Sequence, residues 1–217
     1  MLEVKNINFS YNSKNVIKDF SIKLNLNQIC GIYWPSGSGK TTLLNIIWGL
    51  LKPDNWKVLF EDKDIYIQNF WFISFYRNTQ VWYAFQNFNL LNNFDVEQNL
   101  ELPFLIWTAS KDIEFQNYLL EFLDIKKLMK KKISQISGGE KERVSIAKSM
   151  IHKPKILLLD EPWTYLNKDL QIKIYELMME YFKRYWTVIF ASHDEGTIKY
   201  FDLKSQKNYN DLKICFR

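Results

Sequence analysis

Apolar residues recur along this chain in two periods, and each period predicts one kind of secondary structure. Apolar and polar positions alternate over residues 2–9, which is typical of a strand with one buried face. The uninterrupted apolar runs KILLLD (155–160) and TVIFAS (187–192) predict strands that are buried on both faces, as in the centre of a parallel sheet. Residues 21–34 predict a strand, a short turn and a second, buried strand.

Four segments have apolar residues spaced three to four positions apart, which is the period of an amphipathic helix. The first of them is expected to stop before Pro53, because proline cannot continue a helix. Helical patterns run through residues 94–130 as a whole. The clearest expected helices span 41–51, 114–129, 139–152 and 168–185, and a further strand is expected at 56–62.

Strands and helices alternate along the chain, and this order predicts an α/β fold with a mostly parallel sheet. No linker, low-complexity segment or internal repeat divides residues 1–217. We therefore expect one domain with an N-terminal antiparallel β portion and a helical subdomain inserted at about residues 90–140.

Composition limits the possible function classes. Hydrophobic residues form 47% of the chain and charged residues 24%, which are ordinary globular values and exclude a disordered or fibrous chain. No stretch reaches the roughly 18 apolar residues of a membrane span, and the N-terminus shows no secretory signal. The two cysteines, Cys30 and Cys215, form no disulfide framework, so we expect a reducing, cytoplasmic compartment.

The net charge of +5 comes from 29 basic and 24 acidic residues. A basic balance is compatible with binding to nucleic acid or to an anionic membrane. The one dense basic block is KKLMKKK (126–132), so a solvated, lysine-rich surface is the simpler interpretation. We therefore expect no nucleic acid as a partner and no direct membrane span.

The segment WPSGSGKTT (34–42) lies between an apolar strand and an amphipathic helix, the setting that a phosphate-binding loop requires. Gly37 and Gly39 allow consecutive N–H groups to face one anion, and the following helix adds its positive N-terminal end. Lys40 is expected to reach the β- and γ-phosphates, and the Thr41 hydroxyl to ligate Mg²⁺. The residues expected to bind ATP here are Ser36, Gly37, Ser38, Gly39, Lys40, Thr41 and Thr42. An ordinary glycine- and serine-rich turn is the alternative.

Two carboxylates end an apolar run in ILLLDEP (156–162). Asp160 is expected to hold the Mg²⁺ ion, directly or through water. Glu161 is expected to orient and deprotonate a water molecule for attack on the γ-phosphate. A plain strand that ends in an acidic turn is the alternative, and the phosphate-binding loop upstream makes it the weaker one.

A third motif, ISGGEKERVSIAKSM (136–150), follows the other segments at a characteristic spacing. Together the three motifs resemble the nucleotide-binding domains of ATP-binding-cassette (ABC) proteins, over essentially the whole chain. The resemblance implies a P-loop NTPase core of the RecA-like kind and an ATPase that uses ATP and Mg²⁺. It also implies a homodimer that encloses two ATP molecules.

The resemblance further implies roles for residues outside the phosphate-binding loop. Tyr11 looks like the aromatic residue that stacks on adenine. Gln86 looks like the Q-loop glutamine, which reaches toward Mg²⁺ and takes part in catalysis. His193 looks like the switch histidine that contacts the γ-phosphate, whereas His152 is interpreted as a surface residue near a helix end. The signature residues, which contact the γ-phosphate bound by the opposite subunit, look like Ser137, Gly138 and Gly139.

The stretch from residue 81 to residue 104 is similar to the ATPases of the lipoprotein-releasing and macrolide-export branch. This similarity implies a membrane permease with few spans as a partner, export or extraction as the work, and a place on the inner face of the cell membrane. The apolar lining of the groove that receives the permease is expected to include Phe88, Leu90 and Leu91.

Two other functions stay open. One is a non-transport ABC ATPase that acts on DNA, ribosomes or cofactor assembly, and the other is a nucleotide-binding module with impaired catalysis. The second draws on two departures from the family pattern: Asn167 replaces aspartate, and Trp34 replaces the first glycine of the phosphate-binding loop. Ile136 also replaces leucine before the signature, but this exchange of apolar residues is conservative. The presence of Glu161, His193 and Gln86 speaks against lost catalysis.

Tryptophan and glycine occur in unusual numbers, with 8 Trp and only 7 Gly. About 7% glycine, about 15 residues in a chain of this length, is ordinary. Trp34 stands where glycine begins the loop pattern, Trp56 ends an expected turn, and Trp186 follows an expected helix where glycine often forms the cap. The family pattern also expects glycine at position 82.

We interpret most of these tryptophans as UGA codons that the cell reads as glycine. The alternative is a genuinely tryptophan-rich variant, in which Trp34 crowds the phosphate-binding loop and weakens ATP binding. The sequence leaves both interpretations open for Trp48, Trp71, Trp107 and Trp163.

Overall fold

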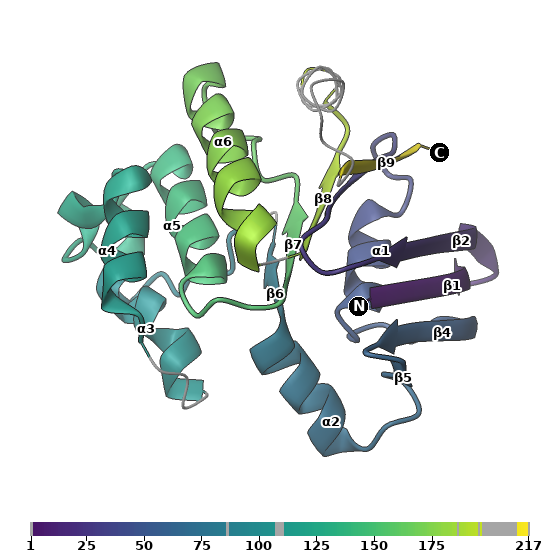
Figure 1. Ribbon diagram of the computed structural model, residues 1–217. Helices are drawn as coiled ribbons and strands as arrows, with labels where there is room; N and C mark the ends of the chain where they lie inside the picture. Colours follow the sequence, from purple (N-terminus) through teal and green to yellow (C-terminus); the bar gives the residue numbers. More distant parts are fainter. Residues whose placement is uncertain are drawn as a thin grey trace.

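The strands form two sheets that lie side by side (Figure 1). The computed structural model describes residues 2–85, 87–106, 111–185, 187–194, 196 and 212–216. Within these residues, one sheet has four strands in the order β2-β1-β4-β5, and the other has five in the order β6-β7-β8-β3-β9.

The four-stranded sheet is antiparallel and contains the N-terminal strands. Its strands are β1 (Leu2–Tyr11), β2 (Lys14–Leu24), β4 (Asn55–Phe60) and β5 (Lys63–Asp64). Asn12 and Ser13 connect β1 to β2, and both have a positive φ, at 47° and 66°. A two-residue turn of this kind matches the right-handed twist of the strands that it joins.

The five-stranded sheet is parallel throughout its described pairs. Its strands are β3 (Ile29–Tyr33), β6 (Val81–Ala84), β7 (Ile156–Asp160), β8 (Thr187–Ser192) and β9 (Leu212–Phe216). Every residue of β7 and β8 is buried, because helices or the other sheet cover both faces. The carboxyl ends of β3, β7 and β8 therefore meet at one edge.

The helices divide into two groups (Figure 1). Helices α3, α4, α5 and α6 lie on the side away from the antiparallel sheet, whereas α1 lies between the two sheets. The helices are α1 (Lys40–Ile47), α2 (Phe70–Phe75), α3 (Val96–Ile106), α4 (Ile113–Phe122), α5 (Gly138–Met150) and α6 (Lys168–Tyr185). A π-helical turn spans Tyr76–Gln80, and 3₁₀ turns span Lys126–Leu128 and Ile133–Gln135.

The α/β fold class with its parallel sheet, antiparallel portion and inserted helices is confirmed. The first helix, however, is shorter than expected and ends at Ile47 rather than near residue 51. Gly49 turns the chain with a φ of 79°, and the amide of Leu50 then donates to the carbonyl of Asn45. A left-handed glycine that closes a helix in this way ends it before Pro53 can act.

The interpretation of His152 as a surface residue is wrong. Its imidazole lies against the Trp82 ring, with ring centroids 4.3 Å apart. Both ring nitrogens are buried, and neither has a hydrogen-bond partner among the described residues. Burial lowers the pKa of this imidazole to about 4, because the charged form loses its hydration.

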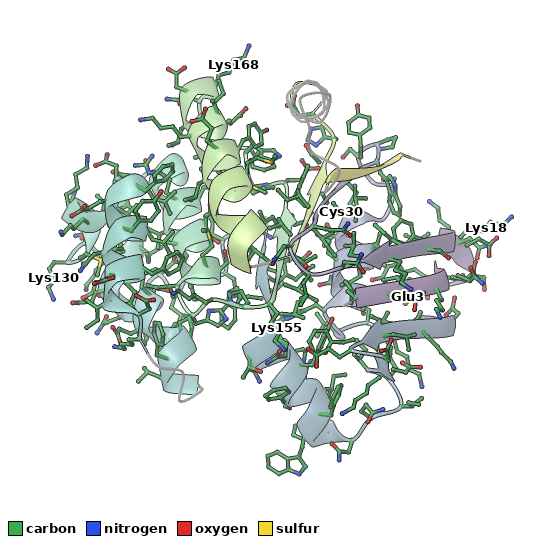
Figure 2. The ribbon with its side chains drawn as sticks, in the orientation of Figure 1. Glu3, Lys18, Cys30, Lys130, Lys155 and Lys168 are labelled. Atoms are coloured by element: carbon green, nitrogen blue, oxygen red, sulfur yellow. The ribbon has the colours of Figure 1, made fainter. Side chains whose placement is uncertain are left out.

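Exposed lysines are spread over the molecule rather than gathered on one face. Figure 2 shows Lys18, Lys130 and Lys168 at three separate outer edges, where their side chains point away from the ribbon. Lys155 instead lies between the two sheets and forms an ion pair with Glu61 at 2.7 Å. Within the described residues, no helix is long and apolar enough to cross a membrane.

Candidate functional site

The loop between β3 and α1 has the backbone of an anion-binding turn. Gly37 and Gly39 have positive φ angles of 72° and 99°, which only glycine adopts without strain. A Cβ atom on Gly39 would also lie 2.6 Å from Cγ1 of Val16, so no larger residue fits there. Ser38 closes the turn through its amide and hydroxyl, which both donate to the Pro35 carbonyl. The first amides of α1 therefore open toward one place, as phosphate binding requires.

The buried ammonium group of Lys40 is held at the centre of this loop. Its Nζ donates to the Trp34 carbonyl at 3.0 Å and to the Pro35 carbonyl at 3.2 Å. It also forms an ion pair with Glu161, with 3.2 Å between Nζ and Oε1. Loop carbonyls and a carboxylate thus fix a positive charge where the loop amides converge.

The carboxylate of Asp160 ends β7 beside the loop. Its Oδ2 accepts from the Thr41 hydroxyl at 2.7 Å and from the Tyr83 hydroxyl at 3.1 Å. Its Oδ1 is buried and has no hydrogen-bond partner among the described residues. Burial is the main cause that raises the pKa of this carboxyl group. A buried oxygen without a donor, next to a hydroxyl, has the chemistry of a site for a hard cation.

Glu161 has an unusual backbone for a residue other than glycine. Its φ is 51°, and its amide donates to the Ala191 carbonyl at 3.0 Å, which ties it to β8. Strain of this kind often marks a functional position. The buried Oε1 of Glu161 lies 2.8 Å from Nδ1 of His193, and hydrogen bonding there requires a proton on Nδ1.

These groups share one cleft with a volume of about 350 Å³. The antiparallel sheet contributes one wall, and the loop, α1 and the ends of β7 and β8 contribute the others. The residues that line it are Tyr11, Val16, Ser36, Gly37, Gly39, Lys40, Thr41, Thr42, Asp160, Glu161 and His193. Ten of these eleven were predicted from the sequence, and Val16 was not.

The signature segment lies elsewhere. The Ser137 hydroxyl accepts from the Glu140 amide at 3.3 Å, and the Glu140 carboxylate accepts from the Ser137 amide at 2.7 Å, which forms a capping box at the start of α5. Ser137 and Gly138 are exposed, and neither lines the cleft. The fold therefore does not bring the signature to the phosphate-binding loop of the same chain.

A buried carboxylate links the signature helix to the loop that follows Glu161. Glu142 on α5 accepts from the Tyr165 amide at 2.8 Å, and burial raises the pKa of its carboxyl group to about 7. The Thr164 hydroxyl donates to the Glu161 carbonyl at 3.0 Å. Glu142 was not predicted as a functional residue, because nothing in its local pattern shows that it is buried.

The predicted residues therefore have different outcomes. Ser38 shapes the loop without lining the cleft, and Gln86 lies outside the described residues. Tyr83, which supports Asp160, was not predicted, because its strand reads as part of the apolar core.

Phe88 lines a second hollow of about 100 Å³, the β6 groove. Leu90 and Leu91 are not among its described lining residues, because Leu90 packs against the core and Leu91 is exposed. The β6 groove is lined by Trp48, Arg77, Asn78, Trp82, Tyr83, Phe85, Phe88, Asn89, Ser145 and Lys148.

Comparison with known proteins agrees with this geometry. Residues 17–164 match the ABC transporter family. The chain is 34% identical to the lipoprotein-releasing system ATP-binding protein LolD of Buchnera aphidicola, over 89% of the chain and 88% of that protein. It is 35% identical to the methionine import ATP-binding protein MetN of Clostridium acetobutylicum, over 92% of the chain but only 63% of that longer protein.

Solved structures show the same likeness. The dimeric structure of a bacterial ABC transporter cassette superimposes with a TM-score of 0.82 at 26% identity, over 92% of this chain and 91% of that chain. The same cassette in a post-hydrolysis dimer bound to ADP and phosphate superimposes with a TM-score of 0.78 at 28% identity, over 90% and 89%. The chain therefore belongs to the ABC transporter family, and it is an ATP-binding cassette of the ATPase type.

Proposed function

We propose that the chain is the ATP-hydrolysing subunit of an ABC transporter and drives a separate membrane permease. The observation that carries this proposal is the single cleft that unites the phosphate-binding loop with Asp160, Glu161 and His193. Phosphate binding, cation binding and water activation each have a suitable group there.

ATP binding is assigned to the loop and to Tyr11. Lys40 and the amides from Ser36 to Thr42 bind the phosphates through charge and directed N–H groups. Tyr11 lines the same cleft from the end of β1, and its half-exposed ring offers a flat surface for adenine. Stacking on an aromatic ring suits a base, because every base has a π face.

The donor set beside the loop fits Mg²⁺. The Thr41 hydroxyl and the Asp160 carboxylate provide the hard oxygen atoms that this ion prefers. One of these atoms, Oδ1 of Asp160, has no hydrogen-bond partner among the described residues. When bound, the ion neutralises phosphate charge. No group of three acidic, histidine or cysteine ligands occurs in the described part of the chain, and phosphates and water are proposed to supply ligands as well. Gln86 is proposed to reach this position from the Q-loop.

Hydrolysis is assigned to Glu161 as the general base. A carboxylate that is held by Lys40 and His193 can orient a water molecule toward the γ-phosphate and accept its proton. His193 holds Glu161 in position and is proposed to contact the γ-phosphate as well.

A second copy of the chain is proposed to complete each site. Ser137, Gly138 and Gly139 are displayed away from the cleft of their own chain, so they are free to reach ATP that is bound by another copy. Two copies that face each other would enclose two ATP molecules, and hydrolysis would loosen them. This closure and opening is the proposed work stroke.

Mixing two inactive variants tests the shared site. Lys40→Ala and Ser137→Ala homodimers each have two damaged sites, whereas the mixed dimer has one site with both residues intact. ATPase activity should reappear on mixing and should not reappear when either variant is mixed with the Lys40→Ala/Ser137→Ala double variant. A mixture that stays inactive would contradict the shared site.

The partner is proposed to be an export-type permease with few spans, which holds the chain at the inner face of the membrane. The match to LolD over most of both chains supports this branch, whereas the match to MetN leaves part of that protein uncovered. Purification from native membranes should recover a multi-span partner, and a gene for a permease beside the coding gene would agree. Recovery of the chain with DNA or ribosomes would favour a non-transport ATPase instead.

A further inference from the structure

Two of the eight tryptophans, Trp48 and Trp82, line the β6 groove. Trp48 ends α1, and its indole packs edge-on against Tyr83 and Phe85, with ring centroids 5.6 Å and 5.3 Å apart. Its Nε1 is buried without a hydrogen-bond partner among the described residues. A buried indole N–H normally has a hydrogen-bond partner, so burial of the Trp48 N–H without one costs folding free energy.

Trp82 is associated with a second cost of this kind, at the neighbouring His152. Its ring lies against His152 and contributes to the burial of both imidazole nitrogens, which find no partner in the described part of the chain. A neutral imidazole has one donor and one acceptor, and both lose water here without replacement. Three buried nitrogens, one in the Trp48 indole and two in the His152 imidazole, therefore have no partner among the described residues.

Trp34 serves the phosphate-binding loop through its backbone. Its carbonyl accepts from Lys40, and its amide donates to the Ser192 carbonyl at 3.4 Å. The indole packs on Phe20 and is not among the described residues that line the cleft. Glycine offers the same backbone carbonyl and amide, and the general loop pattern has glycine at this position. These two backbone contacts therefore do not require tryptophan.

The backbone itself does not require glycine at two positions where the sequence suggested it. Trp34 has no positive φ, and Trp56 lies in the extended strand β4. The prediction that backbone geometry requires glycine at these two positions is therefore wrong. Trp107 and Trp186 lie outside the described residues.

Trp163 provides the contrast. It is 3% exposed, as Trp34 is, but it packs between two aromatic rings, those of Tyr175 and Phe190, with ring centroids 4.5 Å and 5.6 Å away. Its Nε1 also lacks a partner within the described residues, but its ring fills the larger core. Removal of such a ring would leave a cavity between the two neighbouring rings, which favours an aromatic residue there.

We propose that positions 34, 48 and 82 are glycine in the protein as its own cell makes it, through UGA codons translated as glycine, and that Trp163 is a true tryptophan. Glycine at 48 and 82 widens the β6 groove and uncovers His152. Exchange of most of the eight tryptophans also returns glycine to about its ordinary share of 7%. Positions 48 and 82 rest on the groove alone, and only position 34 depends on the proposed function.

The coding DNA and the native protein decide the proposal. We expect UGA codons at 34, 48 and 82, a UGG codon at 163, and glycine at the first three positions in peptides of the protein isolated from its own cells. UGG codons at 34, 48 and 82, or tryptophan in those native peptides, would overturn it. A UGA codon at 163 would overturn the distinction drawn for that residue. Neither measurement depends on ATPase activity.

A variant tests the structural part separately. Trp82→Gly should raise the pKa of His152 from about 4 toward the ordinary 6.5, measured by NMR titration of its ring protons. Trp71→Gly is the matched control, because Trp71 is 76% exposed on α2 and should leave His152 unchanged. An unchanged His152 pKa in Trp82→Gly would show that the indole does not bury the imidazole.

Discussion

The phosphate-binding cleft and the signature segment differ in how far one chain completes them. In the cleft, Lys40 and Glu161 are buried and bonded to each other, and His193 is bonded to Glu161. In the signature segment, Ser137 is exposed, and its hydroxyl accepts from the Glu140 amide to cap α5. The cleft is preorganised by its own fold, whereas the exposed polar groups of the signature do not line that cleft.

The link between the two regions is short. The Glu142 carboxylate accepts a hydrogen bond from the Tyr165 amide, and the Thr164 hydroxyl donates one to the Glu161 carbonyl. Movement of α5 can therefore reach the proposed general base through one loop. Changes in the cleft should remove chemistry or binding within a chain, and changes in the signature should remove only what a second copy supplies.

Glu161→Gln should have the largest effect. The amide keeps the size of the side chain but cannot accept a proton, so hydrolysis should fall by ~10²-fold or more, the scale of a lost general base. ATP binding should persist, and a stable dimer should accumulate in size-exclusion chromatography with ATP. Glu121→Gln on the exposed face of α4 is the control. Hydrolysis at the original rate would remove Glu161 from its proposed role.

Lys40→Ala should weaken nucleotide binding by roughly 10- to 100-fold, the scale of a lost hydrogen bond to a charged group. The change also leaves Glu161 without its ion-pair partner. Direct titration of ATP by calorimetry is the measurement. Lys57→Ala, an exposed position in β4, is the control. Unchanged affinity in Lys40→Ala would exclude this residue from the site.

Two substitutions of Ser137 distinguish its proposed role in the signature from its role as the cap of α5. Ser137→Ala and Ser137→Asn should both lower hydrolysis by roughly tenfold or more, because a hydrogen bond to a charged group is lost. Only the alanine variant should also lose about 0.5–2 kcal/mol of unfolding free energy, since asparagine still caps a helix. Chemical denaturation and an ATPase assay measure the two effects. Normal hydrolysis in Ser137→Asn would limit Ser137 to the cap.

Glu142→Gln should have the smallest effect on hydrolysis, and its effect on stability should appear in the pH dependence of the unfolding free energy. The folded pKa of about 7 lies above the value of 4.5 for the unfolded chain, so folding binds a proton between these values. The parent protein should therefore lose unfolding free energy, up to about 3 kcal/mol, as the pH rises from 4.5 through 7. Glutamine keeps an oxygen for the Tyr165 amide and does not titrate. Parallel stability curves for both proteins would contradict this assignment.

Much of the fold could be predicted because its signals are local. The strands at 156–160 and 187–192 and the helix at 168–185 agree with the structure to within a residue. The segment from Lys63 to Gln80 was not predicted, because a two-residue strand and a π-helical turn have no clear periodicity. Helix α1 was predicted too long, since the apolar period continues past the glycine that ends it.

The sequence by itself determined the phosphate-binding loop, because Gly37, Gly39, Lys40 and Thr41 are neighbours and their spacing sets the turn and the helix start. It also determined that two acidic residues end a buried strand. Only the tertiary structure decided that Thr41 bonds to Asp160, 119 positions away, that Glu142 is buried, and that the signature does not line the cleft. Such contacts arise when sheets and helices pack, and no local spacing encodes which distant side chains then meet.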